Sequence, residues 1–189
     1  MGEVHRLQPV RLPAEGNEGT PNKKGFDYFY GYLSQLHAHN PYPEFLIRNE
    51  SRIPLRNRLH PDAVKLGDSG AGWAVEKHAF APDLMTEEAL RWVREQTVQH
   101  PSQPFFLFWS LITPHANNEA TRPTGNGQEI PSLGVYATNA WPLPDRAHAA
   151  TITRLDDDAG RLLDLLRALK IDNNRSEEHT SELQSPCNL

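Results

Sequence analysis

The stretch Pro104-Phe-Phe-Leu-Phe-Trp-Ser-Leu-Ile-Thr-Pro114 decides the predicted fold. Between its two prolines, residues 105–112 form an almost continuous apolar run that is rich in aromatic and branched side chains. A short run of this kind, bounded by residues that break regular structure, is typical of a strand buried on both faces, as in a parallel sheet. It therefore predicts an α/β protein with a central strand at residues 105–112.

A helix is predicted on each side of this run. Residues 83–98 carry an apolar stripe, and Thr86 is the candidate cap. Residues 145–170 repeat apolar side chains every three or four positions, and Asp157 and Arg161 are expected to form an ion pair. Helix, buried strand, surface excursion and helix is the order of elements in an open α/β sheet.

The remaining segments carry weaker patterns of apolar and polar residues. A glycine-containing loop at 14–25 leads into an aromatic run at 26–33, for which periodicity does not choose between helix and strand. Residues 45–47 fit a strand, and the proline- and glycine-containing segments 51–73 and 116–144 are predicted to be long loops.

Composition excludes several classes of protein. The chain has 189 residues, a formal net charge of −5 and a mean hydropathy of −0.63. No apolar run approaches the roughly 20 residues of a membrane span, and mild acidity argues against a general nucleic-acid binder. The single cysteine, Cys187, allows neither an intrachain disulfide nor a cysteine zinc cluster.

The two ends are expected to lie outside the domain. Residues 175–189, which include Cys187, resemble the conceptual translation of a sequencing-library adapter and are expected to be an artefactual or disordered tail. Residues 1–13 carry no pattern and are consistent with a mis-started or frameshifted segment. Residues 14–174 are left as the domain portion.

Histidines are the main candidates for chemistry. In an open α/β sheet, ligands bind beyond the carboxyl ends of strands, and His115 is the first titratable side chain after residues 105–112. His37 and His39 could share a metal if extended, or could simply pack against nearby tyrosines. Residues 156–158 are consecutive aspartates, but on a helix they would fan around the axis rather than form a metal site.

Three segments together resemble the arylsulfatase-type sulfatases of the alkaline-phosphatase-like superfamily. They are Pro21-Asn-Lys-Lys-Gly-Phe-Asp-Tyr-Phe-Tyr-Gly-Tyr-Leu-Ser-Gln-Leu-His-Ala-His-Asn40, Pro104-Phe-Phe-Leu-Phe-Trp-Ser-Leu-Ile-Thr-Pro-His-Ala-Asn-Asn-Glu119 and Ala149-Ala-Thr-Ile-Thr-Arg-Leu-Asp-Asp-Asp-Ala-Gly-Arg-Leu-Leu163. The resemblance implies an α/β sandwich with a mostly parallel sheet, here truncated at both ends. It implies hydrolysis of sulfate esters, either aryl sulfates or sulfated sugars, with a formylglycine nucleophile and a calcium ion.

By this resemblance, His115 contacts the sulfate and can act as a general acid. His37, His39 and Asn117 are expected to bind substrate. The Cys-x-Pro-x-Arg motif that yields formylglycine, the Gly-Lys-Trp motif and the aspartate and asparagine metal ligands do not occur in the sequence. The chain is therefore expected to be an interior fragment that holds no metal and is inactive by itself. The family implies a periplasmic or extracellular location.

Two alternatives stay open. One is a phosphodiesterase or phosphonate hydrolase of the same superfamily. The other is a non-catalytic glycan-binding protein that uses the tyrosine- and tryptophan-containing segments 28–42 and 136–141.

Overall fold

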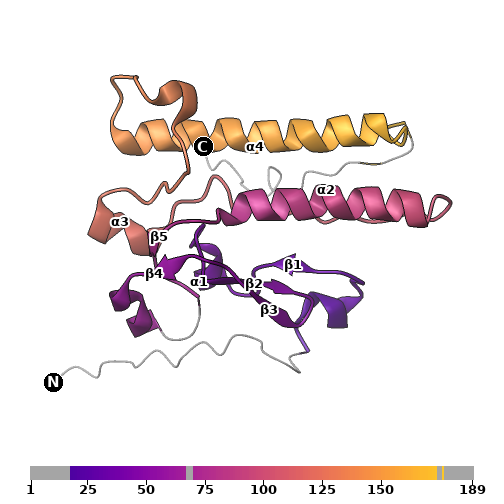
Figure 1. The fold of residues 1–189 in the computed structure, drawn as a ribbon, viewed down its shortest axis with the longest axis horizontal. Coiled ribbons are helices and arrows are strands. Elements are labelled where there is room, and N and C mark those ends of the chain that lie inside the picture. Colours follow the sequence, from indigo (N-terminus) through magenta and orange to yellow (C-terminus); the bar gives the residue numbers. More distant parts are fainter. Residues whose placement is uncertain (1–17, 67–69, 174–175, 177–189) are drawn as a thin grey trace, which may run out of the picture.

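The computed structural model describes residues 18–66, 70–173 and 176. Figure 1 shows α2 lying between α4 on one side and the short strands on the other. In chain order the elements are η1 (Pro21–Lys24), β1 (Tyr30–Gly31), α1 (Gln35–Ala38), β2 (Phe45–Arg48), β3 (Ser51–Pro54), β4 (Arg58–Leu59), η2 (Pro61–Leu66), β5 (Ala74–Glu76), α2 (Ala81–Gln99), α3 (Asn118–Thr124), η3 (Gly134–Tyr136) and α4 (Leu143–Ala168).

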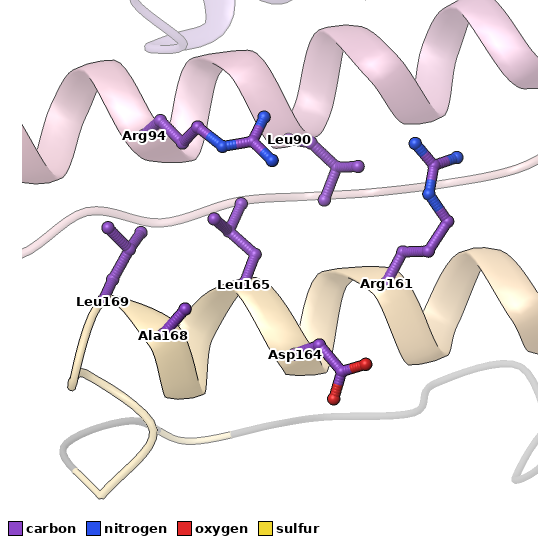
Figure 2. A pocket seen from close by; sticks show the side chains of 7 residues that line it. All are labelled: Leu90, Arg94, Arg161, Asp164, Leu165, Ala168 and Leu169. Atoms are coloured by element: carbon purple, nitrogen blue, oxygen red, sulfur yellow. The ribbon is translucent and has the colours of Figure 1, made fainter.

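The two long helices, α2 and α4, confirm the helices predicted from the apolar periodicity at residues 83–98 and 145–170. They pack through Leu90 and Val93 of α2 and Leu165 of α4, all buried. Partly buried side chains from both helices and from the following segment surround this cluster: Trp92, Leu107, Leu162, Leu166 and Leu169. An open groove of about 520 Å³ lies along the same interface, with Arg94 and Arg161 at its edges (Figure 2).

Polar contacts between α2 and α4 correct two details of the prediction. Thr86 does not cap a helix but lies inside α2, fully buried, and its hydroxyl donates to Asp158 at 3.0 Å. Arg161 pairs with Asp158 and with Glu87 rather than with Asp157. Both errors have one cause: Asp158 faces the neighbouring helix, and this tertiary contact decides which side chains meet.

The strands form two small antiparallel sheets, in the orders β1-β2-β3 and β4-β5. Strand β2 confirms the strand predicted at residues 45–47. The prediction of a long loop at residues 51–73 was wrong, because this segment contains β3, β4 and η2. The β2–β3 turn is made by Asn49, whose φ of 55° lies in the left-handed region that asparagine tolerates. The Asn49 side chain also accepts from the main-chain N–H of Phe29 at 3.0 Å, which joins β1 to this turn.

Residues 105–112 do not form the predicted buried strand. The segment has no regular secondary structure, and among the described residues 105–111 make no main-chain hydrogen bond. Phe106 and Phe108 are 73% and 65% exposed, whereas Leu107 packs on the α2–α4 cluster. A central strand needs a neighbour on each side, and every strand pair in the described part of the chain is antiparallel and lies elsewhere.

No helix in the described part of the chain is long and apolar enough to cross a membrane.

We expect Leu90→Ala to lower the free energy of unfolding by about 2–3 kcal/mol, because it removes buried methyl groups where α4 packs. Urea unfolding followed by circular dichroism measures the change. Val98→Ala is the matched control, because Val98 lies on the same helix but is 73% exposed; its effect should stay within about 0.5 kcal/mol. Equal losses in the two variants would contradict the packing described here.

Candidate active site

His115 lies just beyond the apolar segment, on an exposed turn. Its main-chain N–H donates to the carbonyl of Ile112 at 3.0 Å. Its Nδ1 lies 2.6 Å from the main-chain oxygen of Ala116. Because a carbonyl oxygen only accepts, Nδ1 carries the hydrogen, and Nε2 is the ring atom left for other chemistry.

His39 lies directly against His115. The two imidazole rings stack with centroids 5.0 Å apart and planes only 6° from parallel. His39 is the C-cap residue of α1, and its Nδ1 lies 3.2 Å and 3.3 Å from the two carboxylate oxygens of Glu119. The structure therefore joins two predicted site residues with a third that sequence analysis missed.

Nothing in the sequence links Glu119 to His39, because 80 positions separate them. The one feature of the sequence that could have indicated Glu119 as a site residue is that it ends the sulfatase-like segment 104–119, which also contains His115. Proximity on that segment could have suggested Glu119, but its pairing with His39 required the fold.

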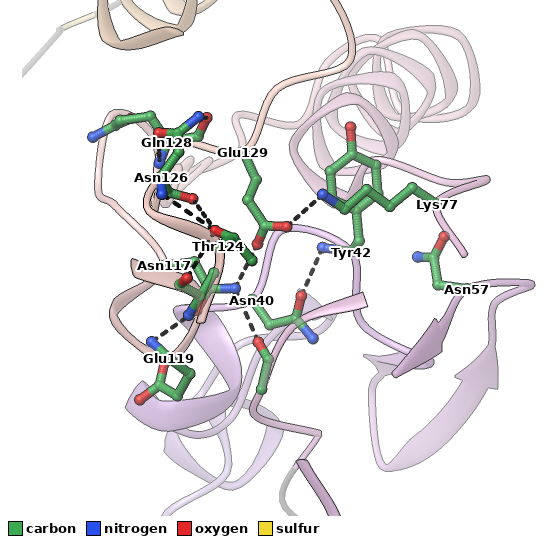
Figure 3. Close-up of polar contacts among 12 residues, drawn as sticks. Asn40, Tyr42, Asn57, Lys77, Asn117, Glu119, Thr124, Asn126, Gln128 and Glu129 are labelled. Carbon is green, nitrogen blue, oxygen red and sulfur yellow. Dashed lines mark hydrogen bonds and ion pairs between the residues drawn. The ribbon is translucent and has the colours of Figure 1, made fainter. Parts of the chain in front are cut away.

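Asn117 holds this part of the site together from a fully buried position (Figure 3). Its side-chain oxygen caps α3 by accepting from the main-chain N–H groups of Glu119 and Ala120. Its amide nitrogen donates to Gly72 at 2.9 Å and to Glu129 at 2.6 Å. These four hydrogen bonds use all the donors and acceptors of the side chain, so the role of Asn117 in this structure is to stabilise the fold. Its expected contact with substrate stays a prediction.

Glu129 extends this network across the site. Its side chain is 4% exposed and forms an ion pair with Lys77 at 2.7 Å. The Lys77 ammonium in turn lies 5.2 Å from the centre of the Tyr42 ring, within reach of a cation–π contact. Figure 3 shows Lys77, Glu129 and Asn117 connecting the segment after β5 to the segments on either side of α3.

Asn40 fixes the end of α1, next to His39. It is fully buried, donates to the carbonyl of Gly70 at 3.2 Å and accepts from the main-chain N–H of Tyr42 at 3.0 Å. The Tyr32 hydroxyl donates to the main-chain oxygen of Asn40 at 2.8 Å. Three hydrogen bonds of the neighbouring Asn40 therefore fix the backbone next to His39.

His37 has a different environment from His39. It is fully buried, its Nε2 donates to the carbonyl of Phe45 at 3.1 Å, and its ring meets Tyr32 edge-on. Gly70 comes so close that a Cβ there would lie 2.5 Å from the His37 ring. The packing interpretation of this residue is confirmed, while a role in binding substrate stays a prediction.

His37 and His39 do not face a common metal. The idea of a shared site assumed an extended segment, but this segment is helical, and residues two apart on a helix do not face each other.

A family model described as Sulfatase matches residues 12–176. The chain belongs to the sulfatase family. The match spans most of the sequence and includes all the site residues described above. It implies a fold of the alkaline-phosphatase-like α/β type. No curated protein matches the chain.

The described residues of this sulfatase do not fit the calcium ion that the family implies. Across residues 18–66 and 70–173, no group of three or more histidine, cysteine or acidic side chains could hold a metal. Within the aspartate run, Asp158 is engaged by Thr86 and Arg161. Cys187 lies outside the described residues.

His37 should make the sulfatase chain less stable in mild acid. Burial lowers its pKa from 6.5 to about 4, although the hydrogen bond to Phe45 partly opposes the shift. Between these two values the unfolded chain binds a proton that the folded chain does not. The free energy of unfolding should therefore fall as pH falls, by up to about 1.4 kcal/mol per pH unit and about 3 kcal/mol in all.

Urea unfolding at several pH values between 6.5 and 4 measures this slope. His37→Gln keeps a donor for Phe45 but cannot titrate, so its slope should be shallower than that of the original chain. His100→Gln, at an exposed position, is the control and should leave the slope unchanged. If His37→Gln and the original chain have the same slope, His37 does not cause the acid sensitivity.

Proposed function

We propose that this sulfatase chain supplies the His115 side of a site that hydrolyses sulfate esters of the arylsulfatase type, either aryl sulfates or sulfated sugars. The observation that carries the proposal is the stacking of His115 on His39 at the end of residues 105–112. Both rings have Nδ1 committed to an oxygen atom, so both offer Nε2 to a bound molecule.

An oxyanion suits this arrangement. The two rings lie 5.0 Å apart and each leaves Nε2 free of the described residues, so one anion could accept a hydrogen bond from both. After the S–O bond of the ester breaks, the leaving oxygen needs a proton, which an imidazolium can give near neutral pH. His115, at the exposed end of the segment, is the candidate donor.

Residues outside the described part of the chain would have to supply the nucleophile and the metal. We propose that a complete sulfatase domain provides formylglycine and calcium from such residues, and that the present chain alone does not turn over substrate. The periplasmic or extracellular location that the family implies belongs to the same proposal.

We also propose that residues 105–112 form a strand of a mostly parallel sheet in the complete domain. Two observations support this: the main chain of residues 105–111 is unpaired among the described residues, and the Trp109 Nε1 is buried with no partner there. The exposed Phe106 and Phe108 are the side chains that a covering layer would bury.

Hydrogen exchange tests this idea. In the present chain, the amides of residues 105–111 should exchange far faster than those of α2, because only the helix amides are hydrogen-bonded. In a complete sulfatase domain, the same amides should become protected. Fast exchange in both proteins would contradict the strand assignment.

Inorganic sulfate tests the site itself. In calorimetric titrations near pH 6 we expect weak binding by this chain, with a loss of about tenfold in His115→Ala, because a charge-assisted hydrogen bond is removed. His100→Ala is the exposed control and should bind like the original chain. An aryl sulfate should show no turnover with or without added calcium. Sulfate binding that is unchanged in His115→Ala would contradict the proposal.

The glycan-binding alternative rests on one specific observation. Trp141 is 51% exposed and stacks on Tyr136, with ring centroids 6.1 Å apart. Such a surface can hold a sugar ring, either as part of a sulfated substrate or without any hydrolysis. Binding of unsulfated sugars that His115→Ala leaves unchanged would favour the second possibility.

A further inference from the structure

Glu119 and His39 form a largely buried pair. Their side chains are only 16% and 12% exposed, so this is not a loose surface ion pair of the kind that contributes little. Both carboxylate oxygens lie within 3.3 Å of the same nitrogen, Nδ1. The pair also joins α1 to α3 across 80 positions of sequence.

This contact determines which nitrogen of His39 carries a hydrogen. An ionised carboxylate only accepts hydrogen bonds, so Nδ1 must donate. The other nitrogen, Nε2, has no hydrogen-bond partner among the described residues and is not one of their buried unsatisfied atoms. The contact therefore leaves Nε2 as the atom of His39 that can gain or lose a proton.

The pair also affects His115, because the His39 ring lies flat against it. A ring held at Nδ1 by two oxygens cannot turn about its χ2 angle without breaking that contact. The face that His39 presents to His115 is therefore fixed by Glu119. Asn117 fixes Glu119 in turn, by capping the first turn of α3.

We propose that Glu119 is a positioning residue of the sulfate-ester site. It holds His39 at Nδ1, so that Nε2 is the atom that can hydrogen-bond to the oxygens of the bound ester, and it keeps the His39 ring stacked on His115, the proposed proton donor. The proposal rests on the function proposed above for His115. A purely structural role at the start of α3 would leave the hydrogen position on His39 unchanged.

Long-range ¹H–¹⁵N correlation spectra of the full chain, recorded near pH 8.5 where imidazole is neutral, show which nitrogen carries the hydrogen. In the original chain we expect His39 in the Nδ1–H form. Glu119→Ala removes the acceptor, and His39 should change to the Nε2–H form that free histidine prefers. Glu119→Gln keeps an acceptor oxygen, so the Nδ1–H form should persist, with its proton resonance shifted upfield by the weaker bond.

Glu95→Ala is the matched control, because Glu95 lies on α2 and pairs with Arg91 rather than with a histidine. It should leave the His39 spectrum unchanged. If Glu119→Ala fails to fold by circular dichroism, the upfield shift in Glu119→Gln still decides. An Nε2–H form in the original chain, or a spectrum that neither Glu119 variant changes, would overturn the proposal.

Titration with inorganic sulfate separates this proposal from the one on which it rests. We expect Glu119→Ala to weaken sulfate binding about tenfold. This is the lower end of the loss that follows when a carboxylate that orients a metal-binding histidine is removed, and Glu119 orients His39 in the same way. If the original chain binds no sulfate but the tautomer of His39 still depends on Glu119, the proposed function fails and the coupling is supported. If sulfate binds equally well to both proteins, positioning by Glu119 is overturned.

Discussion

The buried amide of Asn117 is the interaction on which the arrangement of the site depends. It closes the first turn of α3 with its oxygen, and it binds Gly72 and Glu129 with its nitrogen. A buried amide that meets all these partners specifies one backbone arrangement, because any shift leaves polar atoms without a partner. Since His115 and Glu119 each lie two positions from Asn117, this single side chain fixes the approach of both to His39.

The two long helices were predictable because their signal is local and repeated. Apolar side chains at spacings of three and four mark one face of a helix whatever the rest of the chain does. The errors occurred where a side chain serves a neighbouring helix. Thr86 has the character of a cap residue, yet its hydroxyl donates to Asp158 of α4. A threonine in either role looks the same in a sequence.

Residues 105–112 show the limit of reading strands from apolar runs. The run records a preference for an extended backbone with both faces covered. It does not record where the neighbouring strands come from, and the described residues place none beside it. The described residues cover only one face of this segment, where Leu107 packs on the α2–α4 cluster. Phe106 and Phe108 are mostly exposed to solvent.

His37 and His39 show why the site was only half predictable. The one-turn helix α1 carries them on opposite sides, since side chains two positions apart on a helix diverge. His37 enters the interior beside Phe45, where burial lowers its pKa and keeps it neutral. His39 meets Glu119 and His115, which come from far along the chain. Two histidines that look equivalent in the sequence thus acquire opposite electrostatic surroundings, because a charge partner for one of them exists only after α1 and α3 have packed together.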